Sequence, residues 1–374
     1  MKHYTRMMEK PRWLPRPDDA PAIENVRRVL VVKLRHLGDV LLTSPVFSSL
    51  AHHAPHIEID ALVYRDTAEM LSGHPDIAQL FTIDRKWKHL GLLRQFRAEA
   101  SLISALKARS YDLIINLTEH NRGVWLSRLL RPKVAVAPAG EFGWLFNRSF
   151  THRYHVVGGN RRHTVEIHLD SLRRIGVYPT PDERRLTLVP GTEATEKVAR
   201  HLAEHALAER SFILVHPGSR WHFKCWTVAH MQELIRGLQA RGWRVVLSAA
   251  PDRAELAMVD DILDGLTDVV SFAGSLSLKE LAALTGRARL FIGVDSAPMH
   301  IAAAMGTPTV ALFGPSGDIE WGPWQVPSRI ITADYPCRPC GLDGCGGGKR
   351  SECLEAIGSN QVLGAVQSLL AETD

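Results

Sequence analysis

The chain has 374 residues, a length typical of two or three domains, and two is the simplest interpretation. Hydrophobic residues make up 45% and charged residues 23% of the chain, which excludes disordered, collagen-like and coiled-coil proteins. The formal net charge of +5 suits an anionic substrate or an acidic membrane surface and does not require a nucleic acid.

The first 25 residues carry a charge or a proline every few positions and lack the apolar stretch of a signal peptide, so they predict a flexible leader over residues 1–25. The longest apolar segment, residues 290–314, is interrupted by Asp295 and His300, and we expect no transmembrane helix. Five cysteines in a chain without an export signal favour reduced thiols or a metal, and a cytoplasmic location.

Apolar runs of strand length alternate with helix-like segments after this leader. Strands are expected over residues 26–34, 57–63, 111–117 and 133–136, and helices over residues 41–52, 98–109 and 124–130. Because strands that alternate with helices form parallel sheets covered on both faces, this half predicts an α/β domain, which we assign to residues 26–185.

The alternation restarts after a proline-rich, charged segment over residues 179–190, and we assign residues 186–210 to a linker and a helix. Further strands are expected over residues 212–216, 244–249, 269–271, 290–294 and 309–313, and helices over residues 227–241, 252–263, 278–285 and 298–305. These elements predict a second α/β domain over residues 211–358, with a Cys-rich segment at 337–353, and a closing helix over residues 359–374.

Two doubly wound domains place a ligand cleft between the carboxyl ends of their sheets. No strand runs into G-x-G-x-x-G, which argues against a nicotinamide-dependent dehydrogenase. The segment GCGGGK at residues 344–349 lacks the first glycine and the final Ser or Thr of a nucleotide phosphate loop.

The first candidate motif is KLRHLGDVLLTSP at residues 33–45. Gly38 supplies a tight turn, Asp39 stands at the mouth of the next helix, and Ser44 with Pro45 is typical of an N-cap and first-turn pair. An acid at this place would face the cleft; alternatively, Asp39 only caps the helix.

The second candidate motif is HPGSRWHFKCW at residues 216–226. Its Pro-Gly-Ser turn offers backbone N–H groups, and with Ser219, Arg220 and Lys224 it predicts a cradle for an anion. The alternative is an ordinary surface loop with basic residues.

The third candidate motif lies at residues 293–314, where a buried strand ends at Asp295 and a helix follows. The N–H groups near Ser296 and Ala297 are where a diphosphate would bind, because unsatisfied donors and the helix dipole act together at a helix N-terminus. His300 could add a hydrogen bond, or be structural.

Together, the motifs K-x4-G-D-V-x4-P, H-P-G-S…K-x-W and D-S-x3-H-x-A-A-A-x-G-x-P resemble those of the heptosyltransferases of lipopolysaccharide core assembly, inverting glycosyltransferases with the GT-B fold. The resemblance extends over about residues 27–372 and implies two Rossmann-like domains facing a cleft. Residues 337–354 are most similar to the enzymes that add the third, branching heptose.

The resemblance implies ADP-L-glycero-β-D-manno-heptose as the donor and an inner-core heptose of the lipid A–core oligosaccharide as the acceptor. It also implies an enzyme peripheral to the cytoplasmic face of the inner membrane, without a nucleic-acid partner. Asp39 matches the family's proposed general base, and Lys224 matches the residue that neutralises the departing diphosphate. The donor-binding residues that we expect are Gly38, Ser219, Arg220, Asp252 (towards the ribose), Leu276 (towards the adenine), Asp295, Ser296, Ala297 and His300. The chain has no D-x-D motif, and we expect no cofactor for catalysis.

Four cysteines cluster near the end of the second domain: Cys337, Cys340, Cys345 and Cys353. The C-x2-C half resembles a zinc knuckle, and four thiolates satisfy a structural zinc site, but the spacing of the second half is irregular. A structural zinc, reduced packing thiols and a disulfide all remain open.

The histidines of the first domain, together with nearby arginines, suggest an electropositive acceptor site or a solvated surface; they are His52, His53, His56, His152, His155, His163 and His168. Three alternatives to the main functional hypothesis are another heptosyltransferase of the same pathway, a sugar-nucleotide epimerase, and a non-catalytic zinc-ribbon protein that binds nucleic acid. The zinc-ribbon alternative leaves Asp39 and the Asp295 loop unexplained.

Overall fold

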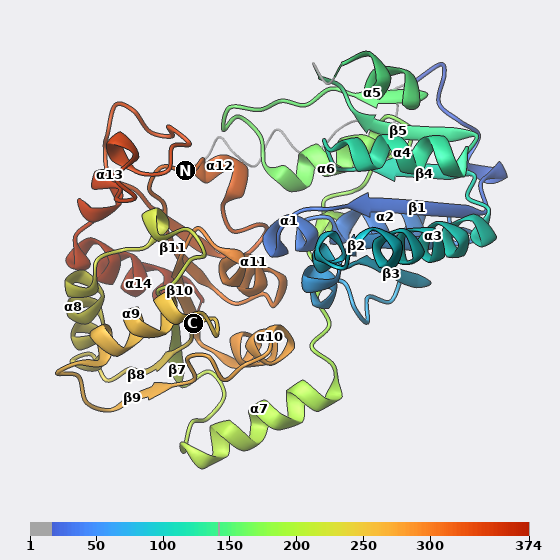
Figure 1. The fold of residues 1–374 in the computed structure, drawn as a ribbon. Coiled ribbons are helices and arrows are strands. Elements are labelled where there is room, and N and C mark those ends of the chain that lie inside the picture. Colours follow the sequence, from blue (N-terminus) through green and yellow to red (C-terminus); the bar gives the residue numbers. More distant parts are fainter. Residues whose placement is uncertain (1–16, 141–142, 374) are drawn as a thin grey trace. The chain divides into compact units, whose positions relative to one another are not determined.

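The computed structural model describes residues 17–140 and 143–373, which form two compact units (Figure 1). Unit 1 comprises the described residues up to Val157 together with Val165–Arg185, and unit 2 comprises Gly158–Thr164 and the described residues from Leu186 onward. The short exchange at residues 158–164 was not expected from the sequence.

The leader predicted over residues 1–25 lies outside the described residues up to position 16. Its remainder is attached to unit 1: the Asp19 carboxylate pairs with Arg174 at 2.5 Å, and residues Ile23–Asn25 form a 3₁₀ turn. The flexibility predicted for residues 1–25 stays a prediction.

Unit 1 contains a six-stranded parallel sheet with the order β3-β2-β1-β4-β5-β6. Its strands are β1 Arg28–Lys33, β2 Glu58–Tyr64, β3 Gln79–Ile83, β4 Leu113–Asn116, β5 Val134–Pro138 and β6 His152–Tyr154. Its helices are α1 Leu37–Leu41, α2 Ser44–His53, α3 Leu92–Arg109, α4 Asn121–Leu130, α5 Trp144–Ser149 and most of α6 Thr164–Arg173. The middle of the central strand β1, residues 29–32, is wholly apolar because both faces of the sheet are covered. On one face, Leu30 and Val32 pack in a cluster with Leu102, Leu106 and Leu126 of α3 and α4.

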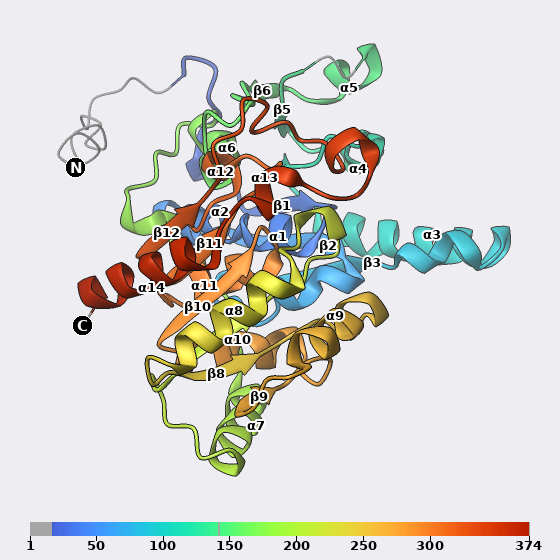
Figure 2. The ribbon, with the colours of Figure 1, turned by 90° about the vertical axis from the view of Figure 1, so that its left-hand side faces the viewer.

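Unit 2 repeats this architecture, with the strand order β12-β11-β10-β7-β8-β9 (Figures 1 and 2). Its strands are β7 Phe212–His216, β8 Arg244–Leu247, β9 Val269–Ser271, β10 Leu290–Val294, β11 Thr309–Leu312 and β12 Ser328–Ile331. Its helices are α7 Thr192–Glu204, α8 Val228–Gln239, α9 Arg253–Leu263, α10 Leu278–Arg287, α11 Ala297–Ala304, α12 Asp318–Trp321, α13 Glu352–Glu355 and α14 Ser359–Thr373. The predicted α/β fold with two doubly wound parallel sheets is confirmed.

The first motif folds differently from the prediction at one point. Helix α1 ends at Leu41, and α2 begins at Ser44 with Thr43 as its N-cap, so the prediction of Ser44 as the N-cap is wrong. Pro45 has no N–H and cannot continue the hydrogen bonds of α1, which is why the chain starts a second helix here. Among the described residues, no helix has the length and apolar character needed to cross a membrane.

Candidate active site

Asp39 lies directly beyond the carboxyl end of the central strand of unit 1. Strand β1 ends at Lys33, and Asp39 follows in the first turn of α1, whose N-cap is His36. The carboxylate is 18% exposed, and its Oδ1 lies 3.9 Å from Nζ of Lys33. Asp39 is therefore not the N-cap of the helix, and its carboxylate stands at the edge of the sheet where α/β proteins bind ligands.

Lys33 is a residue of the site that the sequence analysis did not select. Its buried Nζ donates a hydrogen bond to the Leu117 carbonyl at 3.1 Å and lies 2.9 Å from Nε2 of His168. Nδ1 of His168 lies 3.1 Å from the Leu42 carbonyl, which can only accept, so Nδ1 carries the proton and Nε2 accepts from Lys33. His168 thus holds the ammonium group beside Asp39.

The histidines of the first domain do not form one acceptor surface. His163 and His168 are buried, and His163 belongs to unit 2, where its Nε2 bonds the Gly322 carbonyl at 2.9 Å. His53 contacts the Glu183 carboxylate at 3.1 Å, and His152 Nε2 contacts the Asp19 carbonyl at 2.7 Å. The interpretation of these histidines as a single electropositive site is wrong, because histidines that are close in sequence contact different partners in the structure.

We expect the activity to depend on the charge of Lys33. Burial lowers the pKa of Lys33 to about 8, although the Asp39 carboxylate opposes this shift; Arg35 adds to it and Glu119 opposes it. The ammonium charge is present below this pKa and is lost as the pH rises through it, so the rate of the catalysed reaction should fall above about pH 8. Lys33→Arg retains the charge and should move this alkaline limb upward. Identical alkaline limbs in Lys33→Arg and the wild type would contradict this assignment.

In unit 2, the structure brings together Lys224 and Asp295, which are 71 residues apart in the sequence. Lys224 ends a 3₁₀ turn at His222–Lys224, and Asp295 follows β10. Nζ of Lys224 lies 2.5 Å from Oδ2 of Asp295, and the two side chains are 22% and 8% exposed. These two residues, predicted separately, thus form a largely buried ion pair.

The pair adjoins the N-terminus of α11. Ser296 is the N-cap of this helix, makes no side-chain cap hydrogen bond, and is followed by Ala297. The first N–H groups of a helix have no acceptor within the helix, so they and the Lys224 ammonium offer donors and positive charge to an anion. His300, in the same helix, is buried.

In the loop after β7, Ser219 and Arg220 both contact Trp221 of the same loop. Ser219 is buried, and its hydroxyl accepts a hydrogen bond from the Trp221 N–H at 3.3 Å. Arg220 is exposed and lies over the Trp221 ring, with its guanidinium carbon 5.3 Å from the ring centroid. Their predicted roles towards the donor stay predictions.

Asp252 caps α9, accepting hydrogen bonds at Oδ1 from the Ala254 and Glu255 N–H groups at 2.9 and 3.4 Å. Leu276 is half-buried and directly precedes Ser277, the N-cap of α10. The predicted contacts of Asp252 with the ribose and of Leu276 with the adenine stay predictions.

Glu255 is a buried carboxylate that the sequence analysis missed. Its Oε2 accepts a hydrogen bond from the Ala250 N–H at 3.0 Å and lies 3.7 Å from Nε2 of His216. Burial raises the pKa of Glu255 and lowers the pKa of His216 to about 4, so His216 is neutral at neutral pH. A Cβ at Gly218 would lie 2.5 Å from Oε2 of Glu255, so a larger residue here would displace this carboxylate from its present position. The spacing D-x-x-E at residues 252–255, typical of a helix start, was the available signal.

The Cys-rich segment packs against the Lys224 loop. The Ser351 hydroxyl donates a hydrogen bond to the Phe223 carbonyl at 2.6 Å, and the indole N–H of Trp226 donates one to the Ile357 carbonyl at 3.0 Å. The Cys-rich segment is far from Lys224 in sequence. In the structure, hydrogen bonds from this segment and from the residues just after it hold the loop that carries Lys224.

The four clustered cysteines are free thiols, so the disulfide alternative is not realised in this structure. Burial raises the pKa of Cys353, and the thiols of Cys345, Cys340 and Cys337 act on it in the same direction. Nevertheless, within residues 17–140 and 143–373 no three His, Cys, Asp or Glu side chains are arranged to hold a metal ion. The present geometry of the thiols does not fit a zinc ion, and zinc binding stays a prediction.

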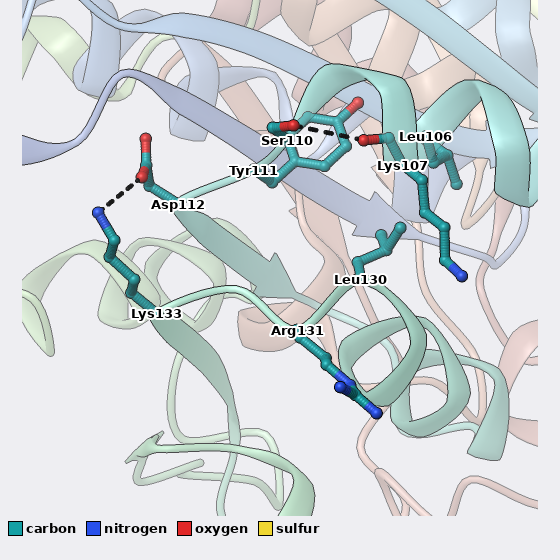
Figure 3. Close-up of a pocket in the computed structure, with 8 residues that line it drawn as sticks. All are labelled: Leu106, Lys107, Ser110, Tyr111, Asp112, Leu130, Arg131 and Lys133. Carbon is teal, nitrogen blue, oxygen red and sulfur yellow. Dashed lines mark hydrogen bonds and ion pairs between the residues drawn. The ribbon is translucent and has the colours of Figure 1, made fainter.

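A depression of about 280 Å³ in unit 1 lies away from these residues (Figure 3). It is lined by residues that directly precede β4 and β5, including Asp112 and Lys133, whose side chains pair at 3.3 Å. These are the amino ends of the strands, whereas Asp39 follows the carboxyl end of β1. The depression is therefore not part of the candidate active site.

Comparison with known proteins gives the family. The model of glycosyltransferase family 9 (heptosyltransferase) matches residues 99–349. Lipopolysaccharide heptosyltransferase 3 of Escherichia coli K12 is 37% identical over 348 residues, which is 91% of this chain and 97% of that protein.

Solved structures agree in fold. A family 9 glycosyltransferase from Veillonella parvula gives a TM-score of 0.79 at 23% identity and covers 94% of this chain and 99% of its own. Escherichia coli heptosyltransferase WaaC with ADP gives a TM-score of 0.72 at 20% identity, covering 91% of this chain and 99% of its own. The fold is thus the GT-B fold of these enzymes, and neither a sugar-nucleotide epimerase nor a zinc-ribbon protein accounts for the family match. The chain belongs to glycosyltransferase family 9, the heptosyltransferases.

Proposed function

We propose that this protein is an inverting glycosyltransferase that transfers heptose from ADP-L-glycero-D-manno-heptose to an inner-core heptose of lipopolysaccharide, adding the third, branching heptose. The observation that carries the proposal is the Lys224–Asp295 pair next to the N-terminus of α11, where a cation and helix N–H groups together suit a diphosphate. The similarity to lipopolysaccharide heptosyltransferase 3 supports heptose as the sugar and the third position as the product.

In the proposed reaction, the acceptor hydroxyl attacks the anomeric carbon of the donor. Asp39 takes the hydroxyl proton as a new C–O bond forms, and the bond from the anomeric carbon to the diphosphate oxygen breaks. ADP leaves from the face opposite to the attack, so the configuration at the anomeric carbon inverts. Lys33 holds its positive charge 3.9 Å from the Asp39 carboxylate.

Negative charge grows on the diphosphate as it departs. The Lys224 ammonium and the N–H groups at Ser296 and Ala297 would stabilise this charge, the role that a divalent cation has in other enzymes. Asp295 holds the ammonium in place at 2.5 Å. Each group is fixed before the reaction begins, so little reorganisation is needed during it.

We expect transfer to survive EDTA. Lys224 and the helix donors supply the charge compensation, and the chain has no D-x-D motif to hold a metal against the diphosphate. The rate measured with EDTA added to the assay should equal the rate without it, and added Mg²⁺ should not raise the rate. Strict dependence on Mg²⁺ or Mn²⁺ would contradict this mechanism.

We also propose a structural zinc held by Cys337, Cys340, Cys345 and Cys353, whose thiols would have to rearrange from their present positions to bind it. A zinc there would fix a Gly-rich segment with few apolar residues of its own. Elemental analysis of protein purified without chelator should find about one zinc per chain, as for a single four-thiolate site. Cys340→Ser should then lower the melting temperature, whereas Cys225→Ser, outside the cluster, should leave the metal content unchanged. If the protein contains no metal and all four thiols can be titrated, the proposal of a structural zinc is wrong.

The proposed location is the cytoplasm, with peripheral attachment to the inner membrane, because the acceptor is lipid-anchored. No nucleic acid takes part in the proposed function. The proposed partners are ADP-heptose and the lipid A–core oligosaccharide.

A panel of acceptors tests the position of the new heptose. Core oligosaccharides that carry none, one or two inner-core heptoses are each incubated with ADP-heptose, and their masses are measured. A one-heptose increment confined to the acceptor with two heptoses supports the third, branching position. Transfer to an acceptor with fewer heptoses would instead assign the protein to another heptosyltransferase step of the pathway.

A further inference from the structure

Exposed apolar side chains gather on one face of unit 1. The described chain exposes twelve large apolar residues, and eight of them lie between residues 90 and 145. These eight are Leu90, Leu92, Leu93, Phe96, Trp125, Leu129, Trp144 and Leu145. They belong to α3, α4, α5 and the turn before α3, which we call the α3–α5 face. Concentrated apolar exposure of this kind marks an interaction surface.

The first turns of α3 are the most exposed part of this face. Leu92, Leu93 and Phe96 are 87%, 79% and 72% exposed, whereas Leu102 and Leu106 further along the helix are buried in the core of unit 1. In Figure 2, α3 extends clear of the strands of its own unit. The N-terminal part of α3 therefore presents apolar side chains that are mostly exposed to solvent.

Helices α4 and α5 continue the apolar surface. Trp125 and Leu129 lie one turn apart on α4 and are 56% and 44% exposed, and a groove of about 390 Å³ next to Trp125 runs between α3 and α4. Trp144 opens α5 at 69% exposure, with the Arg148 guanidinium over its ring. Tryptophan side chains with a basic neighbour are typical of surfaces that meet the headgroup region of a bilayer.

The charge of this region is strongly positive. Residues 85–133 contain eleven Lys and Arg against three Asp and Glu, whereas the whole chain has a formal net charge of only +5. The excess is therefore local, and the rest of the chain is slightly acidic. On the exposed turns of α3, Arg94 and Arg97 alternate with the apolar residues and form no ion pair with any residue that the structure describes.

We propose that the α3–α5 face docks this protein on an anionic lipid membrane. Leu92, Leu93 and Phe96 would enter the boundary between headgroups and acyl chains, and the surrounding Lys and Arg would meet lipid phosphates. Charge complementarity selects this occupant, because apolar side chains interleaved with cations match a surface that is apolar beneath a layer of negative charge. The inference rests on the proposed function in one respect: docking would keep unit 1 near the lipid-anchored acceptor that we propose.

Sedimentation with vesicles tests this docking directly. The full chain should sediment with vesicles of phosphatidylethanolamine and phosphatidylglycerol, less so as salt is raised, and weakly with phosphatidylcholine. The triple variant Leu92→Ser/Leu93→Ser/Phe96→Ser should bind the anionic vesicles about tenfold more weakly, since its apolar anchor is lost. All three positions are exposed, so folding should be unaffected. Ile319→Ser/Leu342→Ser, at exposed apolar residues of unit 2, is the matched control and should bind as the wild type does.

The charge contribution is measured with a second pair of variants. Arg94→Glu/Arg97→Glu should lose binding to anionic vesicles and retain the weak binding to phosphatidylcholine. Arg200→Glu/Arg241→Glu changes the net charge equally on unit 2 and should bind nearly as well as the wild type. Equal losses in both pairs would show that only net charge matters and would overturn the assignment to the α3–α5 face.

Two further outcomes would overturn the proposal. One is unchanged vesicle binding by the triple variant. The other is concentration-dependent self-association that the triple variant abolishes, without any vesicle binding, which would make a second copy of the chain the occupant.

Failure of the docking and failure of the proposed function are distinguishable. On a delipidated, water-soluble acceptor, the triple variant should transfer heptose at the wild-type rate, whereas on vesicle-embedded acceptor its rate should fall with its binding. Vesicle binding without transfer to any acceptor would reject the proposed function and leave the docking intact. Transfer to both acceptors without vesicle binding would reject the docking and leave the proposed function intact.

Discussion

Asp39→Ala is expected to abolish heptose transfer while ADP binding stays nearly intact. The carboxylate acts on the acceptor proton, whereas the nucleotide is expected to bind unit 2. Removal of a general base typically lowers the rate by about 10²–10⁴. The kcat for transfer, and the affinity for ADP measured by calorimetry, separate the two effects.

Asp39→Asn should be nearly as inactive as Asp39→Ala, because the amide retains the shape but cannot accept the proton. Asp182→Asn removes a carboxylate that is 90% exposed on the same unit and should leave the rate unchanged. A rate above about a third of the wild-type value in Asp39→Ala would show that the carboxylate only stabilises α1, because loss of a base costs far more.

Lys224→Ala should impair both donor binding and turnover, with a loss in kcat of about 10²–10³, the size found for removal of a single oxyanion donor. The ammonium meets charge in the bound diphosphate and more charge as it departs. The variant also leaves the Asp295 carboxylate, 8% exposed, without its cation and near the incoming diphosphate. Steady-state kinetics and ADP affinity measure both consequences.

The double variant Lys224→Ala/Asp295→Asn removes that uncompensated carboxylate and separates the two causes. Recovery of ADP binding without recovery of kcat is the expected result, since only the ammonium stabilises the departing charge. Lys133→Ala, which removes an 80% exposed lysine of unit 1, is the control. Unchanged affinity and turnover in Lys224→Ala would move the anion site to another residue, with Arg220 the next candidate.

The sequence predicted the buried strands well and the edge strands poorly. Strands β7 and β10 begin and end at the predicted residues, since buried strands of a parallel sheet are continuous apolar runs. Among the edge strands, β9 is the exception: it is half-exposed, yet its bounds were predicted because two of its three residues are valines. Strands β3, β6 and β12 were missed: each lies at the edge of its sheet, is half-exposed along most of its length, and mixes polar with apolar residues. At such strands the hydrophobic pattern that identifies a strand is absent.

The site residues that follow a strand could be predicted from the sequence. Asp39, Lys224 and Asp295 stand beside Gly- or Pro-containing turns at strand ends, and such turns are readable from sequence. His168 comes from α6, 135 residues after its partner Lys33, and no local pattern encodes that contact. Glu255 was missed for a related reason: its spacing marks a helix start, and only folding brings its carboxylate to His216 and Gly218.

Heptose transfer is tested most directly by measuring both products of the reaction in one experiment. Purified protein is incubated with ADP-heptose and a core acceptor that lacks the third heptose, and ADP release and acceptor mass are followed together. We expect one ADP released for each heptose gained by the acceptor, and neither product with Asp39→Ala. Consumption of ADP-heptose to a free or epimerised sugar, with no gain in acceptor mass, would contradict it.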